Sequence, residues 1–239
     1  MKHVPNIITI LNLVAGFISV ILAVNGDLVT ASWLLVAAMV FDWLDGFAAR
    51  MLKSYSDLGK ELDSLADAIS FGVAPALIMY QLLGNSLSLT YPMIFNASSA
   101  IELLILFTPI IMCICAVVRL AVFNLDASQA KSFRGLPTPA NALAVISLVI
   151  ASSYSSRIFF RELLHSTGLL LTMTIVLSLL MVSRLPLMSL KITNLKFRNN
   201  EGRYLLISLV IIALITLGIG SVTLIIPLYI IVSLISLLF

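Results

Sequence analysis

Charged residues are scarce in this sequence. Only 10% of its 239 residues are Asp, Glu, Lys or Arg, whereas 61% are hydrophobic. Apolar runs of about 20 residues repeat along the chain without the alternation of polar and apolar positions that water-soluble helices and strands show. They also lack the alternation of a transmembrane barrel. The composition therefore excludes a soluble domain and predicts an all-α, polytopic membrane protein, since helices satisfy their own backbone groups in lipid.

Cysteine is also scarce. The two cysteines, Cys113 and Cys115, lie two residues apart in an apolar run. Side chains at this spacing point to different faces of a helix, so neither a disulfide nor a metal site is expected. We interpret both as small hydrophobic side chains.

Apolar length and polar breaks predict eight membrane spans. The expected ranges are 7–25, 31–52, 60–82, 101–124, 138–154, 167–184, 203–219 and 222–239. With a cytoplasmic N-terminus, all Lys and Arg residues except Arg157 and Arg161 fall on or near the cytoplasmic side. The prediction is therefore a multi-pass protein of the cell (inner or cytoplasmic) membrane with both termini in the cytoplasm. The net charge of +3 then reflects topology, and no nucleic-acid partner is expected.

Four aspartates lie near the cytoplasmic ends of the second and third predicted spans. Asp42 and Asp45 share a face of one helix, and Asp63 and Asp67 share a face of the next. The loop between the helices is short, so the two acidic faces can meet. Four ionised carboxylates would repel one another and therefore need a cation. Oxygen ligands favour Mg²⁺ or Mn²⁺, and Ca²⁺ could also fit. One ion would fit, and so would a bridged pair of the kind that suits phosphoryl chemistry.

The residues around these aspartates resemble a known family signature. The chain reads Asp42-Trp-Leu-Asp45-Gly46-Phe-Ala-Ala49-Arg50, then has Gly59, Asp63 and Asp67 at fixed spacing. This pattern matches the signature of CDP-alcohol phosphotransferases, with no position missing. The resemblance implies a six-helix core, a homodimer and an active site that opens at the cytoplasmic leaflet. A C-terminal hairpin of two helices would be added to that core.

The resemblance also implies roles for individual residues. It makes Asp42, Asp45, Asp63 and Asp67 the metal site, with two Mg²⁺ or Mn²⁺ ions and with Asp67 as the catalytic general base. It places CDP against Gly46, Ala49, Arg50 and Gly59. The implied division of the chain is a CDP-alcohol phosphotransferase membrane domain over residues 1–200 and a transmembrane hairpin over residues 201–239.

Other segments narrow the acceptor alcohol. The run from Leu62 to Ala76, the segment Arg119–Asn124 and the segment Phe133–Ala140 resemble bacterial and archaeal phosphatidylserine synthases. Val122 departs from that pattern, because an arginine is common at its position. The resemblance covers roughly residues 4–198 and implies that the substrates are CDP-diacylglycerol and L-serine.

Serine is zwitterionic, so its carboxylate needs a cation. Arg119 could supply a bidentate contact, although anchoring at the membrane surface would also explain it. The remaining acceptor candidates are Ser64, Ser70, Lys131 and Arg134. The positive charge of cytoplasmic loops would equally explain Lys131 and Arg134. Helix packing would equally explain Ser64 and Ser70. We interpret Lys191, Lys196 and Arg198 as a basic patch that faces anionic lipid.

Two other functions stay open on sequence alone. A sister transferase that uses glycerol phosphate or inositol phosphate would carry the same signature. A cation transporter is a more remote alternative, because its acidic groups would be expected near the bilayer midplane. His3 is terminal and His165 falls on the predicted outer side, so no histidine is placed to form a covalent intermediate. Direct displacement is therefore the predicted mechanism.

Overall fold

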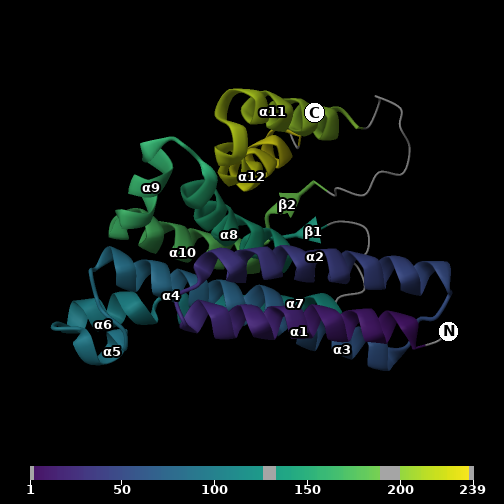
Figure 1. Ribbon diagram of the computed structural model, residues 1–239. Helices are drawn as coiled ribbons and strands as arrows, with labels where there is room; N and C mark the ends of the chain where they lie inside the picture. The colour runs from purple at the N-terminus through teal and green to yellow at the C-terminus, as the bar shows by residue number, and fades with distance from the viewer. Residues whose placement is uncertain (1–2, 126–132, 189–199, 237–239) are drawn as a thin grey trace.

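The molecule is a bundle of helices (Figure 1), seen in a computed structural model that describes residues 3–125, 133–188 and 200–236. The first half contains α1 (Val4–Val24), α2 (Leu28–Met51), α3 (Asp57–Asp67), the π-helix η1 (Ala68–Val73), α4 (Ala74–Ser86), α5 (Met93–Asn96), α6 (Ala100–Phe107) and α7 (Pro109–Leu125). The second half contains β1 (Phe133–Arg134), α8 (Thr138–Tyr154), α9 (Ile158–His165), α10 (Thr167–Val182), β2 (Pro186–Leu187), α11 (Glu201–Leu217), the 3₁₀-helix η3 (Gly218–Leu224) and α12 (Ile225–Ile235). The predicted all-α class is confirmed.

Five helical segments of the described chain are long and apolar enough to cross a membrane. They are Val4–Val24, Leu28–Met51, Asp57–Ser86, Ala100–Leu125 and Glu201–Ile235. A sixth arises if α9 and α10, which meet at 78°, form one broken span, and α8 is a shorter apolar helix. The multi-pass prediction is confirmed, but five or six spans meet the length criterion where eight were predicted. The difference lies in α8, which is short, and in α11 and α12, which η3 joins into one helical segment although each alone is shorter than the criterion requires.

The continuous segment at the C-terminus folds back on itself. Gly218 has a φ of +58°, which interrupts the α-helix. A Cβ atom on Gly202, at the start of α11, would lie 3.3 Å from Cβ of Ser236, just beyond the end of α12. The two helices therefore run antiparallel as a hairpin.

Side-chain caps fix where the two aspartate-bearing helices begin. Asp27 precedes α2 and accepts a hydrogen bond from the Thr30 backbone N–H at 3.1 Å. Hydrogen bonding from Thr30 lowers the pKa of the Asp27 carboxyl. Ser56 precedes α3 and accepts from the Gly59 N–H at 3.0 Å. Such caps satisfy N–H groups that the first helical turn leaves open.

Helix α1 packs against α2, α3, η1 and α4, and this packing holds the aspartate-bearing helices together. A Cβ atom on Gly16 would lie 2.1 Å from Oγ of Ser70, so α1 crosses η1 almost at backbone contact. The Ser19 hydroxyl donates to the Ala31 carbonyl at 2.8 Å and joins α1 to α2. Cys113 and Cys115 are free thiols.

The predicted third span is not a uniform helix. The π-helix η1 begins directly after Asp67 and separates α3 from α4. Short π-helical stretches are often found at functional sites. The polar end of this span, which carries the aspartates, is thereby set apart from its apolar remainder.

Candidate active site

Three aspartates from two helices bring their carboxylates together. One oxygen each from Asp42 on α2 and from Asp63 and Asp67 on α3 lies within 4.8 Å of the others. Asp67 is buried, whereas Asp42 and Asp63 are half-buried. The acidic faces of the two helices therefore meet, and we refer to these three residues as the carboxylate triad.

The carboxylate triad has the chemistry of a divalent-cation site. In the described part of the chain, Oδ1 of Asp63 is buried without a hydrogen-bond partner. Clustered, buried carboxylates are costly unless a cation compensates them. Their hard oxygen atoms suit Mg²⁺ or Mn²⁺. The residues present thus fit the metal that the signature implies.

The fourth aspartate is hydrogen-bonded to α1. Asp45 is 6% exposed, and its Oδ2 accepts a hydrogen bond from the Thr9 hydroxyl of α1 at 2.7 Å. The same hydroxyl also donates to the Pro5 carbonyl at 3.1 Å. Asp45 is not part of the carboxylate triad, so its predicted role as a metal ligand stays a prediction.

Helix α1 supplies polar residues that the sequence analysis missed. Nδ2 of Asn12 donates to Oδ1 of Asp67 at 3.1 Å, while Oδ1 of Asn12 is buried and has no partner within the described ranges. Asn6, Thr9 and Asn12 are three residues apart and share one face of α1. Polar residues recurring on one face of an otherwise apolar helix are a signal that could have identified them.

A pocket of about 420 Å³ lies between α1, α2 and α3. It contains all four residues of the predicted CDP site, and it shares Asp63 with the carboxylate triad. We call it the α1–α3 pocket. Its lining residues are Pro5, Asn6, Thr9, Asp45, Gly46, Ala49, Arg50, Ser54, Tyr55, Ser56, Gly59, Lys60 and Asp63.

The two glycines of the α1–α3 pocket leave room for a ligand in different ways. A Cβ atom on Gly59 would lie 3.0 Å from Oγ of Ser56 and 3.1 Å from Oδ1 of Asn6. At Gly46 the nearest such atom is 3.9 Å away, on the flexible side chain of Arg50. A side chain at position 59 would therefore crowd the wall, and one at position 46 would extend into open space.

Two cations line the same pocket. Arg50 is exposed, and Lys60 is exposed with its Nζ donating to the Asn124 carbonyl at 2.8 Å. Guanidinium and ammonium groups in a pocket of this size suit a ligand that carries phosphate. Lys60 was not among the predicted site residues.

Arg119 on α7 is half-buried. It interacts electrostatically with Asp67 and with Tyr229 of α12. Its Nε is buried and has no hydrogen-bond partner among the residues that the structure describes. A half-buried guanidinium with an unused donor can receive a carboxylate.

Of the other acceptor candidates, Ser64 and Ser70 make their hydroxyl hydrogen bonds to described residues outside the carboxylate triad. Ser64 accepts from Nδ2 of Asn124 at 2.7 Å and donates to the Lys60 carbonyl at 3.1 Å, and Ser70 donates to the Asn12 carbonyl at 3.1 Å. Both hydroxyls thus join neighbouring helices. The backbone of Arg134 lies in β1, opposite Pro186. The remaining predicted cations, Lys131, Lys191, Lys196 and Arg198, lie outside the described residues.

The chain also matches known proteins. Residues 2–182 match the family described as CDP-alcohol phosphatidyltransferase. The archaetidylserine synthase of Methanothermobacter thermautotrophicus is 35% identical over 156 residues, which is 63% of this chain and 59% of the relative. The CDP-diacylglycerol-serine O-phosphatidyltransferase of Helicobacter pylori strain 26695 is 36% identical over 76% of this chain and 70% of its own length. The Bacillus subtilis protein of that name is 31% identical over 62% of this chain and 76% of its own length. The chain thus spans less than two thirds of the first of these relatives.

Proposed function

Because this chain belongs to the CDP-alcohol phosphatidyltransferase family, we propose that it transfers a phosphatidyl group from CDP-diacylglycerol to L-serine. The products would be phosphatidylserine and CMP. One observation carries the proposal: the α1–α3 pocket gathers Gly46, Ala49, Arg50 and Gly59 and shares Asp63 with the carboxylate triad. The names of the Helicobacter and Bacillus relatives support serine as the acceptor.

The donor substrate occupies the α1–α3 pocket in this proposal. The absence of side chains at Gly46 and Gly59 leaves space for the nucleotide, and Arg50 and Lys60 offer donors to its phosphates. The acyl chains of CDP-diacylglycerol stay in the membrane. The lipid then need not leave the bilayer.

The carboxylates hold the metal in this proposal. Asp42, Asp63 and Asp67 form the triad, and Asp45, on the same helix as Asp42, is the fourth proposed ligand. The family resemblance favours two ions, Mg²⁺ or Mn²⁺. Bound metal supplies positive charge that stabilises the attacking and leaving oxygens of a phosphoryl transfer.

Asp67 is the proposed general base. Asn12 holds Oδ1 of Asp67, which fixes the orientation of the carboxylate. Asp67 takes the proton of the serine hydroxyl, and the serine oxygen forms a bond to the phosphorus that carries diacylglycerol. The bond from that phosphorus to the oxygen of CMP breaks, and CMP leaves with the electron pair. Arg119 binds the serine carboxylate.

The proposal also covers topology and assembly. The carboxylate triad faces the cytoplasm of the cell membrane, as the positions of the basic residues favour. Residues 1–200 form the transferase domain and residues 201–239 form an appended hairpin. The resemblance makes a homodimer the expected assembly, which light scattering of the purified protein measures.

Acceptor identity is the main test. Purified full-length protein is given CDP-diacylglycerol in mixed micelles with Mg²⁺ or Mn²⁺ and with L-serine, glycerol phosphate or inositol phosphate in separate reactions. The expected result is metal-dependent CMP release with phosphatidylserine as the product. Activity with another alcohol and none with serine would make the chain a sister transferase, and no CMP release with any acceptor would remove the transferase proposal.

The mechanism has its own test. Asp67→Asn keeps an oxygen that can accept from Asn12 but cannot take a proton, so we expect turnover to fall by about 10²- to 10⁴-fold. Normal turnover in this variant would remove the general-base role. A trapped phosphatidyl-enzyme, or retention of configuration at phosphorus, would contradict direct displacement.

A further inference from the structure

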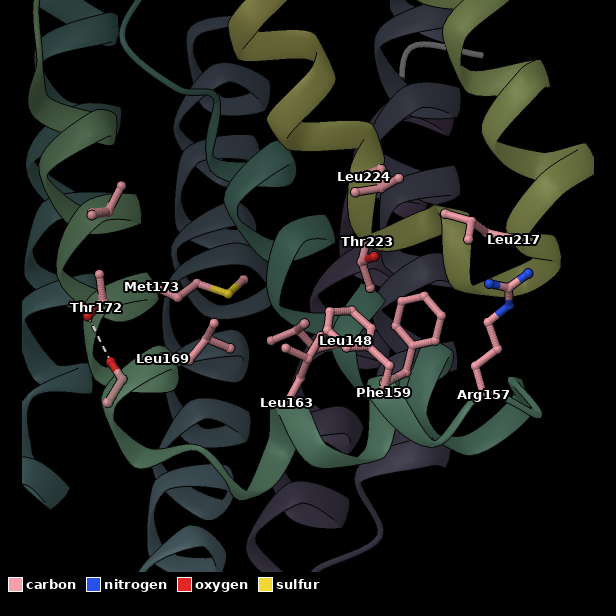
Figure 2. Close-up of a pocket in the computed structure, with 13 residues that line it drawn as sticks. Leu148, Arg157, Phe159, Leu163, Leu169, Thr172, Met173, Leu217, Thr223 and Leu224 are labelled. Atoms are coloured by element: carbon pink, nitrogen blue, oxygen red, sulfur yellow. Dashed lines mark hydrogen bonds between the residues drawn. The ribbon is translucent and has the colours of Figure 1, made fainter.

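A cavity of about 680 Å³ lies away from the active site, between α8, α9, α10, η3 and α11. Figure 2 shows Phe159, Leu163, Leu169 and Met173 on one side of it and Leu217 and Leu224 on the other. In Figure 1, α9 lies at the end of the bundle opposite to the N-terminus and α3. We call this space the α9 cavity, and its size is in the range of small-molecule sites, about 300–1,000 Å³.

The interior of the α9 cavity is apolar, because its few polar side-chain groups are already hydrogen-bonded. Its two hydroxyl groups are already used: Thr172 donates to the Gly168 carbonyl at 2.7 Å, and Thr223 donates to the Gly220 carbonyl at 2.8 Å. None of the lining residues has a buried polar atom without a partner. Such a surface suits a hydrocarbon chain and not a polar ligand.

One cation lies at the edge of this apolar space. The Arg157 guanidinium donates to the Thr216 carbonyl at 2.9 Å, which uses one of its five N–H donors. Arg157 is exposed and forms no ion pair with the described residues. The remaining donors are free to bind an anion in the bidentate geometry that guanidinium offers to phosphate.

Aromatic residues place Arg157 at the level of lipid headgroups. Trp33 and Tyr154 are exposed at the same end of the bundle, and Nε1 of Trp33 donates to the Tyr154 hydroxyl at 3.3 Å. Trp and Tyr gather where the membrane meets water. Tyr154 is three residues from Arg157, so the cation at the edge of the cavity lies near this interface.

We propose that the α9 cavity binds one anionic phospholipid, with an acyl chain in the cavity and the phosphate on Arg157. The bound lipid lies in the outer leaflet, because the carboxylate triad is on the cytoplasmic side in the proposed topology. Its chain contacts both the core helices α8 to α10 and the hairpin elements η3 and α11, so it joins the hairpin to the core. Phe160 of α9 already packs on Gly220 of η3, where an added Cβ would lie 2.2 Å from the ring.

The experiment uses delipidated full-length protein in a neutral detergent. Phosphatidylglycerol and phosphatidylcholine with the same acyl chains are titrated separately, bound lipid is counted by native mass spectrometry, and the thermal midpoint is recorded. We expect one phosphatidylglycerol to bind and to raise the midpoint, with phosphatidylcholine roughly tenfold weaker, because its cationic choline offsets the phosphate charge and is repelled by Arg157. Inorganic phosphate alone should have no effect, because the acyl chain supplies the contact with the cavity.

Three variants separate the parts of the proposed site. Arg157→Gln should lose the preference for phosphatidylglycerol and bind the two lipids with equal affinity. Arg161→Gln is the matched control, because Arg161 lies on α9, is exposed and does not line the cavity. Gly168→Leu adds a side chain where a Cβ has open space and should reduce binding of both lipids.

Several outcomes would overturn the proposal. They are equal binding of the two lipids to the unmodified protein, unchanged phosphatidylglycerol binding in Arg157→Gln, or an equal loss in Arg161→Gln. A midpoint raised by inorganic phosphate alone, and lost in Arg157→Gln, would assign a free-anion site instead. If Gly168→Leu does not fold, the arginine pair decides the result. None of these measurements depends on transferase activity.

Discussion

Replacing Thr9 by Val tests whether α1 belongs to the active site. The substitution keeps the branched shape of the side chain but removes the hydroxyl that donates to Asp45 at 2.7 Å. Thr9 is 4% exposed and Asp45 is 6% exposed, so water cannot easily replace the lost donor. A hydrogen bond to a charged group contributes about 1.5–3 kcal/mol, which corresponds to a factor of about 10 to 150. We expect kcat/KM for CDP-diacylglycerol to fall by that factor.

Thr174→Val is the matched control for this prediction. Thr174 is fully buried in α10, and its hydroxyl donates to the Leu170 carbonyl four residues earlier at 2.8 Å. Thr9 makes the equivalent bond to Pro5 but has the additional contact with Asp45. The assay is CMP release at varied CDP-diacylglycerol and saturating metal, with thermal midpoints to compare folding. The reasoning is wrong if kcat/KM of the two variants agrees within about threefold, since the carboxylate contact would then contribute nothing.

Three further predictions concern the metal, the pocket wall and a helix crossing. Chelation of divalent cations should abolish CMP release reversibly, and Asp63→Asn should raise the half-saturating Mg²⁺ concentration; activity that persists in chelator would contradict the metal site. Gly59→Ala places a Cβ 3.0 Å from Oγ of Ser56, so KM for CDP-diacylglycerol should rise severalfold without loss of folding, and an unchanged KM would place the nucleotide elsewhere. Gly16→Ala places a Cβ 2.1 Å from Oγ of Ser70 and so forces α1 away from η1. We expect the free energy of unfolding to fall by about 1–3 kcal/mol, with a lower thermal midpoint. An unaltered midpoint would mean that the two helices can move apart without cost.

Much of the architecture follows from properties that the sequence displays directly. Long apolar runs predict membrane helices because lipid leaves no other partner for their backbone groups. The helical spacing of Asp42 with Asp45 and of Asp63 with Asp67 predicts that two acidic faces meet, and three of these four carboxylates, those of Asp42, Asp63 and Asp67, lie together. The four residues of the predicted CDP site line one pocket for the same reason, since they share the facing sides of α2 and α3.

What could not be predicted depends on contacts between helices distant in sequence. Helical spacing places Asp45 beside Asp42, but its hydrogen-bond partner is Thr9, 36 residues earlier. Asn12 lies 55 residues from Asp67 and stood among apolar neighbours, where it gave no sign of its partner. The 78° bend between α9 and α10 and the π-helix after Asp67 likewise have no counterpart in the predicted spans. Periodicity identifies which face of a helix is polar, but not which helix lies opposite.

The continuity of the site along the chain has a consequence for how the protein is made. Every residue that lines the α1–α3 pocket, and all of the carboxylate triad, lies between Pro5 and Asp67. Once the ribosome has completed the first three helices, it has therefore supplied every residue of the α1–α3 pocket and of the carboxylate triad. Membrane chains are inserted and folded from the N-terminus onward. The pocket can thus form while most of the bundle, including the hairpin at the far end of the sequence, is still to be translated.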